Sequence, residues 1–340
     1  MKKIRVEDAV GQTLCHDMTA ILADGFKGVK FRRGHVIAPE DIPALLDMGK
    51  SHIFVWEPDA DEVHEDDAAI ALTRAMCGEG VTISGPSEGK MGVSSQRDGL
   101  FLADQEALRA INLVPDYTVA CIPNHMAVKK GAKLAGARIV PLVTRREHVD
   151  RAVSIAREHF PIFSVIPFRP LKTGVIITGS EVYYGRIRDQ FQPIMTRKLE
   201  ALGAQLLGFT KCPDDLAAIN AALEGFKARG AQLILLTGGM SVDPDDLTPS
   251  AIRGKADRLI TQGVPMQPGN MLTIAWWGET ALVGVPGASM HSPVTSLDVF
   301  LPRIFAGVEI TPEEIAGYGL GGLCMNCPQC HWPVCYFGKP

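Results

Sequence analysis

The fold of the central part of the chain is decided by a stretch that reads Leu233-Ile234-Leu235-Leu236-Thr237-Gly238-Gly239-Met240-Ser241. Four consecutive apolar residues are typical of a β-strand buried on both faces, as in a parallel sheet covered by helices. In the Thr-Gly-Gly turn, glycine lets the backbone bend and approach a ligand closely. The stretch therefore predicts a buried strand whose carboxyl end carries a glycine turn.

Two further apolar runs repeat this arrangement. Residues 174–177 lead into Thr178-Gly179-Ser180-Glu181, and residues 281–283 lead into Val285-Pro286-Gly287-Ala288-Ser289. Helices are expected at about 193–202, after Asp214 or Asp215, and at about 290–305, and residues 271–283 suggest a hairpin. Strands that alternate with helices predict an α/β domain at 172–308, with three layers and a largely parallel sheet.

The rest of the chain divides into smaller parts. Residues 1–58 are predicted to form a mixed α/β module with short strands and a helix at 39–46, and residues 63–160 a second mixed α/β region. Cys15, Cys77, Cys121 and Cys212 stand singly among apolar residues and are expected to be buried. Residues 320–340 form a cysteine-rich tail.

Composition narrows the class of protein. The chain has 340 residues, 46% of them hydrophobic, and a formal net charge of −4. Such a chain can bury a sizeable core, and its mild charge gives no support for binding nucleic acid or an anionic membrane. No signal peptide and no run of about 18 uncharged apolar residues is visible, so we expect a cytoplasmic protein.

The three glycine turns are the candidate functional site. In an open α/β sheet, ligands bind in the crevice outside the carboxyl ends of the strands, so the turns meet there if their strands are neighbours. Asp243, Asp245 and Asp246 follow the second turn, and Glu181 ends the first. Carboxylate oxygens in such places suit a magnesium ion that also binds a phosphate. Thr248 is expected to cap the next helix, with Pro249 at its first position.

The alternative is that these are ordinary turns, since turns need glycine and aspartate. Three of them at successive strand ends, two with carboxylates, favour a ligand that carries phosphate and metal. The usual nucleotide motifs are absent from the sequence: residues 85–90 are too short for a Walker loop, and residues 317–322 follow no predicted strand.

The same residues resemble the molybdopterin-binding domain shared by molybdopterin adenylyltransferase and molybdopterin molybdotransferase. The match is carried by Thr237 to Val242 with Asp246 and Thr248 downstream, together with Glu181, Pro268-Gly269 and Pro286-Gly287. It covers about 172–308 and is weaker over 1–155. The resemblance implies that molybdopterin, or adenylyl-molybdopterin, is the cofactor, that molybdate is a further ligand and that magnesium is bound.

Roles for individual residues follow from this resemblance. Glu181 and Asp246 are the expected catalytic carboxylates, and with Asp243 they are the expected magnesium ligands. The expected cofactor contacts lie on the glycine turns and on the segments that carry the resemblance: Thr178, Gly179, Ser180, Thr237, Gly238, Gly239, Met240, Ser241, Thr248, Pro268, Gly269, Pro286 and Gly287.

The sequence also departs from the molybdotransferase pattern. Ser180 stands where an aspartate is usual, Asp243 replaces a glycine, and Asn270 replaces a lysine. The third turn lacks the usual asparagine-proline, and no C-terminal β domain follows Gly307. The loss of one carboxylate and one cation affects catalysis more than binding.

The tail carries Cys324, Cys327, Cys330 and Cys335, with His331 between the last two. Four thiolates in twelve residues suit tetrahedral zinc or an iron–sulfur cluster, and the spacing does not decide between the two metals. The alternative is four free thiols on a flexible tail.

Three functions are compatible with these features. The first is an enzyme of molybdenum-cofactor biosynthesis, a transferase that uses magnesium to insert molybdate into adenylyl-molybdopterin. The second is a carrier that delivers the cofactor to a molybdoenzyme or to another protein of its biosynthesis. The third is a pyrophosphatase that acts on a nucleotide. The resemblance also suggests a homo-oligomer.

Overall fold

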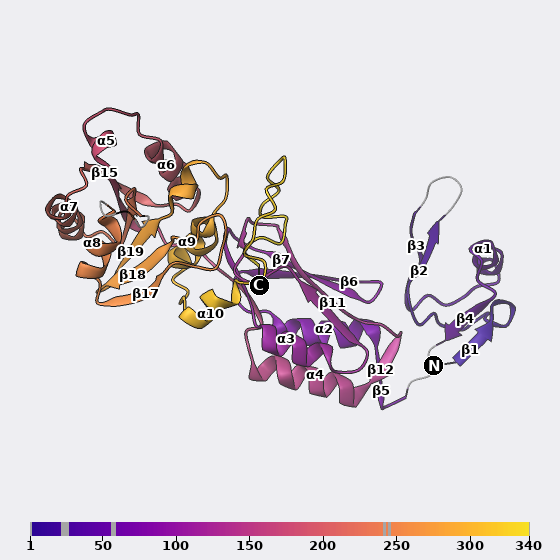
Figure 1. Cartoon of the computed structure of the whole chain (residues 1–340). Coiled ribbons are helices and arrows are strands. Elements are labelled where there is room, and N and C mark those ends of the chain that lie inside the picture. The colour runs from indigo at the N-terminus through magenta and orange to yellow at the C-terminus, as the bar shows by residue number, and fades with distance from the viewer. Residues whose placement is uncertain (1, 22–26, 56–58, 241–242, 244–245, 340) are drawn as a thin grey trace. The chain divides into compact units, whose positions relative to one another are not determined.

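The computed structural model describes residues 2–21, 27–55, 59–240, 243 and 246–339. The candidate site residues Ser241 and Asp245 lie outside the described residues. The chain forms two compact units (Figure 1). The first comprises residues 1–96, 103–122 and 131–164, and the second residues 97–102, 123–130 and 165–340.

The first unit contains short strands and four α-helices among its described residues. Its elements are β1 (Lys2–Arg5), η1 (Val6–Asp8), β2 (Met18–Ile21), β3 (Lys27–Phe31), α1 (Asp41–Asp47), β4 (His52–Val55), β5 (Glu62–His64), α2 (Glu65–Met76), β6 (Val81–Ser87), β7 (Lys90–Ser95), α3 (Gln105–Asn112), β9 (Tyr117–Cys121), β11 (Lys133–Ile139), β12 (Val143–Arg145) and α4 (Arg146–Glu158). The strands form the pairs β1-β4, β2-β3 and β12-β5 and a four-stranded sheet in the order β6-β7-β11-β9.

The second unit contains the α/β domain. Its elements are β14 (Lys172–Thr178), α5 (Ser180–Tyr183), α6 (Phe191–Ala201), β15 (Gln205–Cys212), α7 (Leu216–Ala228), β16 (Leu233–Thr237), α8 (Thr248–Lys255), β17 (Arg258–Gln262), β18 (Thr273–Trp277), β19 (Thr280–Val285), η2 (Gly287–Met290), α9 (Ser296–Ala306) and α10 (Pro312–Gly317). A separate three-stranded sheet has the order β10-β8-β13, formed by β8 (Gly99–Ala103), β10 (Ala127–Val128) and β13 (Phe163–Ile166).

The main sheet has six strands in the order β15-β14-β16-β19-β18-β17. The first four run parallel, and β18 and β17 are antiparallel to their neighbours. Every residue of β16 and β19 is buried, as expected for a sheet covered on both faces. The predicted fold, a largely parallel sheet in a three-layer α/β domain, is confirmed.

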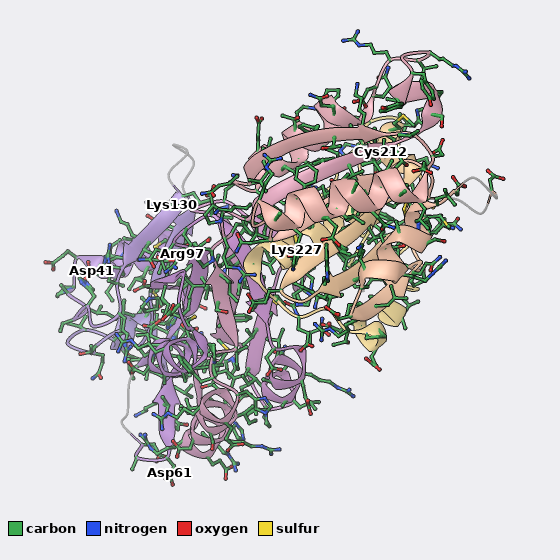
Figure 2. All side chains as sticks on the ribbon, turned by 90° about the vertical axis from the view of Figure 1, so that its left-hand side faces the viewer. Asp41, Asp61, Arg97, Lys130, Cys212 and Lys227 are labelled. Atoms are coloured by element: carbon green, nitrogen blue, oxygen red, sulfur yellow. The ribbon has the colours of Figure 1, made fainter. Side chains whose placement is uncertain are left out.

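Alternate residues of each strand point into two separate cores. Val175 and Leu235 pack with apolar residues of α6 and α9, whereas Ile176 and Leu236 pack with apolar residues of α7 and α8. The two helical layers lie on opposite sides of the sheet in Figure 1. Lys227 of α7, labelled in Figure 2, joins its layer to the sheet by donating to Trp277 O (2.7 Å) and Thr280 Oγ1 (2.8 Å).

Three predicted helix boundaries were wrong. The helix expected at 193–202 spans 191–201, because Asp189 accepts N–H bonds from residues 191 and 192 and starts it earlier. The helix expected at 290–305 begins at Ser296, where Thr295 and Asp298 form a capping box. The first helix of the chain begins at Asp41, and residue 39 lies outside it.

The scattered cysteines are only partly as expected. Cys15 and Cys212 are buried, but Cys77 and Cys121 are half-buried. Desolvation raises the pKa of Cys15 to about 11 and that of Cys77 to about 12. Burial also raises the pKa of the Cys121 and Cys212 thiols. All four thiols are therefore protonated near neutral pH, which fits a packing role.

Candidate functional site

The three glycine turns meet at one edge of the main sheet. Strands β14, β16 and β19 are consecutive neighbours, and Ile177 pairs with Thr237, which in turn pairs with Val285. Because the strands are parallel, their carboxyl ends lie at the same edge. The predicted juxtaposition of the turns is confirmed.

A cavity of about 480 Å³ opens at this edge. Nine residues assigned to the site from the sequence line it: Thr178, Gly179, Glu181, Gly238, Gly239, Met240, Asp243, Asp246 and Gly287. The volume lies within the range of about 300–1,000 Å³ that is usual for small-molecule sites. This cavity, called the acidic pocket below, is the candidate cofactor site.

The second turn requires its two glycines. Gly238 and Gly239 have φ angles of 86° and 49°, in the left-handed region that favours glycine. A Cβ on Gly238 would lie 2.1 Å from the carbonyl oxygen of Thr178, on the neighbouring strand. The absence of side chains therefore lets the turn press against the end of β14 and present backbone to the pocket.

A pair of buried threonines holds the first two turns together. Thr248 Oγ1 donates to Gly238 O at 2.9 Å and lies 3.1 Å from Thr178 Oγ1, which also donates to Thr237 O. The prediction that Thr248 caps the helix was wrong: it is the first residue of α8, after Leu247. Its hydroxyl supports the glycine turn instead of the helix end.

Five carboxylates line the acidic pocket among its described residues: Glu181, Asp189, Asp214, Asp243 and Asp246. Arg188 is the cation among the same lining residues. Asp246 Oδ2 accepts the N–H of Asp243 at 3.1 Å, which fixes the carboxylate beside the second turn. The excess of negative charge favours binding of a cation.

Asp214 was not assigned to the site from the sequence. It follows β15, and its Oδ2 accepts the N–H of Ser180 at 2.8 Å, while its own N–H donates to Ser180 Oγ at 3.2 Å. Ser180 stands where the molybdotransferase pattern has an aspartate, so the structure brings a carboxylate to that position from the neighbouring strand. The position of Asp214 just past a parallel strand is the signal that would have found it.

Asp189 was also missed. Its side chain is only 6% exposed, and Oδ1 accepts the N–H of Phe191 at 2.8 Å. Lys211 Nζ lies 3.7 Å from the other oxygen. An aspartate two residues before an apolar helix start is a capping signal, and here it also places a carboxylate beside the pocket.

Six described residues assigned from the sequence do not line the acidic pocket: Ser180, Thr237, Thr248, Pro268, Gly269 and Pro286. Thr237 is buried at the end of β16, and Pro286 precedes the lining residue Gly287. Pro268 and Gly269 pack against α9, where Ser296 Oγ donates to Gly269 O at 2.6 Å. A cofactor contact by any of these six residues, or by Ser241, stays a prediction.

The tail cysteines are placed away from this pocket. Cys324 and Cys335 are half-buried against the core of α6 and α9, and Cys327 and Cys330 are exposed. Within the described part of the chain, no group of three or more His, Cys, Asp or Glu side chains is arranged to hold a metal ion. This applies to the tail and to the acidic pocket alike.

The helices offer no candidate for a membrane span. Over the described ranges, none is both long and apolar enough to cross a bilayer.

With this geometry in place, comparison with known proteins identifies the class of domain. Residues 174–306 match the family model described as "Probable molybdopterin binding domain", and residues 3–57 match a "Domain of unknown function". The resemblance drawn from the glycine turns is thus confirmed for the α/β domain, which matches this family model over residues 174–306.

Particular relatives cover only part of the chain. A molybdopterin molybdenumtransferase from Synechococcus elongatus is 26% identical over 181 residues, which is 50% of this chain and 42% of that protein. A CinA-like protein from Mycobacterium sp. is 38% identical over 81 residues, or 24% of this chain and 19% of that protein. The chain therefore spans less than half the length of these relatives.

Solved structures include similar folds. A molybdopterin biosynthesis enzyme MoaB from Thermus thermophilus has a TM-score of 0.35 at 21% identity and covers 43% of this chain and 97% of its own. A molybdopterin biosynthesis protein MoeA from Pyrococcus horikoshii has a TM-score of 0.34 at 13% identity. The match covers 90% of this chain and 74% of that protein. The assignment of the fold here stands on the strand order of the main sheet.

Proposed function

We propose that the acidic pocket binds molybdopterin or its adenylyl form and that the protein inserts molybdate into adenylyl-molybdopterin with the help of magnesium. The observation that supports this proposal most strongly is the set of carboxylates at the carboxyl ends of adjacent parallel strands. They lie beside a turn whose glycine backbone lines the pocket. Donor chemistry of this kind fits a magnesium ion that shares its shell with ligand phosphate and water. Mg²⁺ typically takes only one or two protein carboxylates, so a preformed cluster of three is not required.

The residues have separate roles in this proposal. Glu181 and Asp246 are the carboxylates for the metal, and Asp243 supports Asp246 through its backbone N–H. Asp214 supplies the carboxylate that Ser180 lacks. The bound metal would neutralise negative charge on the phosphoanhydride as it breaks. Gly238 and Gly239 offer their backbone to the pterin phosphate.

The test is release of AMP from adenylyl-molybdopterin by the full chain. Release should require both molybdate and magnesium. Asp246→Asn should slow it by about 100-fold or more, a usual cost of losing a preorganised charged group. Asp150→Asn, an exposed aspartate on α4, is the matched control and should be as active as the wild type. Full activity of Asp246→Asn would exclude its catalytic role.

A carrier is the second candidate function. It is favoured by Asn270, which stands where the molybdotransferase pattern has a lysine. Tight binding of the cofactor without release of AMP would identify the carrier and exclude the transferase. Cleavage of free dinucleotides would instead identify a pyrophosphatase.

The proposal extends to the tail, where Cys324, Cys327, Cys330 and Cys335 would bind zinc or an iron–sulfur cluster. Their spacing supports this, although binding would have to draw the exposed and half-buried thiols together. Metal analysis of the purified chain should give about one zinc or one cluster per chain. The double variant Cys327→Ser/Cys330→Ser should lack this metal. An equal metal content in the wild-type protein and the double variant would contradict the assignment.

We also propose that the protein acts in the cytoplasm as a homo-oligomer and passes its product to a molybdoenzyme or to another protein of cofactor biosynthesis. The support is the domain family alone. Cross-linking and co-purification from cells that make the cofactor would test it, and an exclusively monomeric protein that captures no such partner would contradict it.

A further inference from the structure

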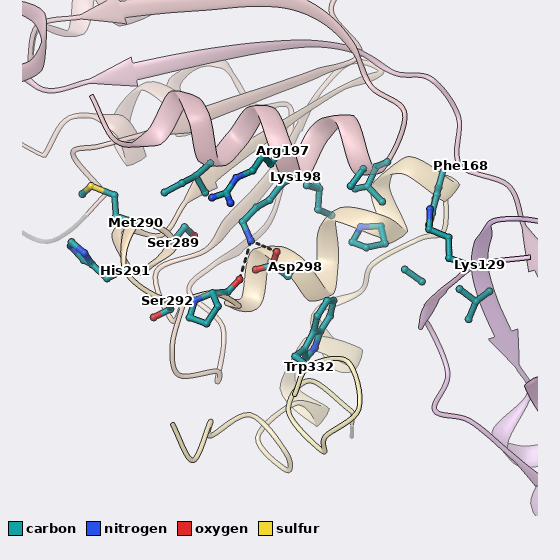
Figure 3. A pocket seen from close by; sticks show the side chains of 18 residues that line it. Lys129, Phe168, Arg197, Lys198, Ser289, Met290, His291, Ser292, Asp298 and Trp332 are labelled. Carbon is teal, nitrogen blue, oxygen red and sulfur yellow. Dashed lines mark hydrogen bonds and ion pairs between the residues drawn. The ribbon is translucent and has the colours of Figure 1, made fainter. Parts of the chain in front are cut away.

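A second cavity, of about 670 Å³, lies in the second unit (Figure 3). It is bounded by α6, by residues 289–293 at the end of η2 and just after it, by α9 and by Trp332 of the tail. Its volume is in the range of about 300–1,000 Å³ for sites that bind small molecules. It shares Met290 with the acidic pocket but contains none of that pocket's carboxylates. We call it the basic cavity.

The charge of the basic cavity is opposite to that of the acidic pocket. Lys129, Arg197 and Lys198 line it, with Asp298 as the carboxylate among its described lining residues. Asp298 is already engaged, because it accepts from Lys198 Nζ and from the N–H of Thr295. Arg197 is exposed and has no ion-pair partner among the described residues. Lys129 is paired with Asp98 at 2.8 Å, so Arg197 is the cation of this lining that no described carboxylate neutralises. The cavity therefore carries a local positive charge in a chain whose net charge is −4.

The remaining wall is apolar and partly aromatic. Phe168, Ile194 and Leu301 line it, and Trp332 contributes an indole ring from the tail. In Figure 3, Arg197 and Lys198 descend from α6 toward the cavity, and Trp332 lies on its opposite side. Ring stacking on one side and charge-assisted hydrogen bonds on the other select for a ligand with both features.

We propose that the basic cavity binds a small organic anion that combines an aromatic ring with a phosphate group, as a mononucleotide does. Arg197 binds the phosphate, with the ammonium group of the Lys198–Asp298 pair beside it, and Trp332 packs against the ring. The acidic pocket repels such an anion unless a metal is present, so the two cavities take ligands of different character. The inference does not depend on the proposed cofactor chemistry.

The experiment is calorimetric titration of the full chain with AMP in the presence of a chelator, which removes metal-dependent binding in the acidic pocket. Wild-type protein should bind AMP more tightly than either inorganic phosphate or adenosine alone. Arg197→Ala should weaken binding by about tenfold, the effect of losing one charge-assisted hydrogen bond. Arg109→Ala, an exposed arginine on α3, is the matched control and should bind as the wild type does.

Trp332→Leu tests the aromatic wall, and should weaken AMP binding by several-fold while leaving the affinity for inorganic phosphate unchanged. The proposal is overturned if wild-type protein does not bind AMP, or if Arg197→Ala binds it as tightly as the wild type. It is also overturned if the chain self-associates through this face and AMP has no effect, since the occupant is then a second copy. A failure to release AMP in the transferase assay would have no bearing on binding of AMP in the basic cavity.

Discussion

At the scale of single residues, the proposed site depends on the contact between Ser180 and Asp214. The sequence shows that a carboxylate is missing at Ser180, but only the pairing of β14 with β15 shows that Asp214 lies beside it. A long-range contact of this kind leaves no local pattern. The contact between Asp214 and Ser180 gives the pocket a carboxylate close to the position where the sequence has a serine in place of an aspartate.

Asp214→Asn is therefore expected to lower magnesium affinity and AMP release by about tenfold or more while leaving the melting temperature nearly unchanged, because the amide oxygen still accepts the Ser180 N–H. The neighbouring Asp215→Asn is the matched control, since Asp215 caps α7 and asparagine caps equally well. Titration calorimetry with Mg²⁺ measures the effect. Equal affinities for the two variants would remove Asp214 from the site.

Thr248 makes a structural contribution that can be separated from binding. Thr248→Val removes a buried hydroxyl that donates to Gly238 O, which is left without this partner. We expect a loss of about 1–3 kcal/mol in the free energy of unfolding. Thr248→Ser keeps the hydroxyl and should lose much less. Denaturant unfolding of both variants measures this, and equal losses would show that the methyl group matters instead.

His125 gives a prediction about pH. Burial, with a smaller contribution from the Arg303 cation, lowers the pKa of His125 to about 4. The unfolded chain, with a pKa near 6.5, binds this proton more readily, so the folded state loses stability as the pH falls from about 6.5 to 4. His125→Gln should show a shallower loss over this window. An identical pH profile of the melting temperature would contradict the shift.

At the scale of elements, the buried strands could be predicted because their apolar runs are uninterrupted. The strand expected at 174–177 is β14, and the run at 233–236 is β16. Helix starts were less accurate because capping depends on side-chain geometry. Pro293 disfavours helical backbone just before it, and the capping box of Thr295 fixes the start of the helix at Ser296.

The same capping box gives a prediction for α9. Thr295→Ala removes the side chain that accepts the N3 N–H at the start of this helix. The expected loss is about 1 kcal/mol in the free energy of unfolding. Thr295→Ser should restore most of it. Thermal unfolding checks both, and a variant as stable as the wild type would mean that tertiary packing alone fixes the helix start.

At the scale of the whole molecule, the tail packs onto the α/β domain. From the sequence, a flexible tail was an alternative. Gln267 and Leu323 form a parallel bridge, and Phe337 is only 1% exposed within the core of α6 and α9. Cysteine spacing draws attention to metal and gives no information about Phe337. Its burial arises from contacts with residues distant in the sequence, which local patterns do not encode.

Phe337→Ala is expected to lower the free energy of unfolding by about 3–5 kcal/mol, the usual cost of emptying a buried aromatic site. Phe337→Leu should cost much less, because it refills most of the volume. If the tail were loosely attached, the two variants would have the same stability as the wild type in denaturant unfolding.

The central claim is that the acidic pocket holds a molybdopterin. The most direct test is to purify the full chain from cells that make the cofactor and to measure the released pterin by fluorescence and mass spectrometry, with metal analysis on the same sample. We predict near-stoichiometric molybdopterin, in a form whose nucleotide content separates the transferase from the carrier. Absence of pterin, even after the cofactor is added back, would contradict the claim.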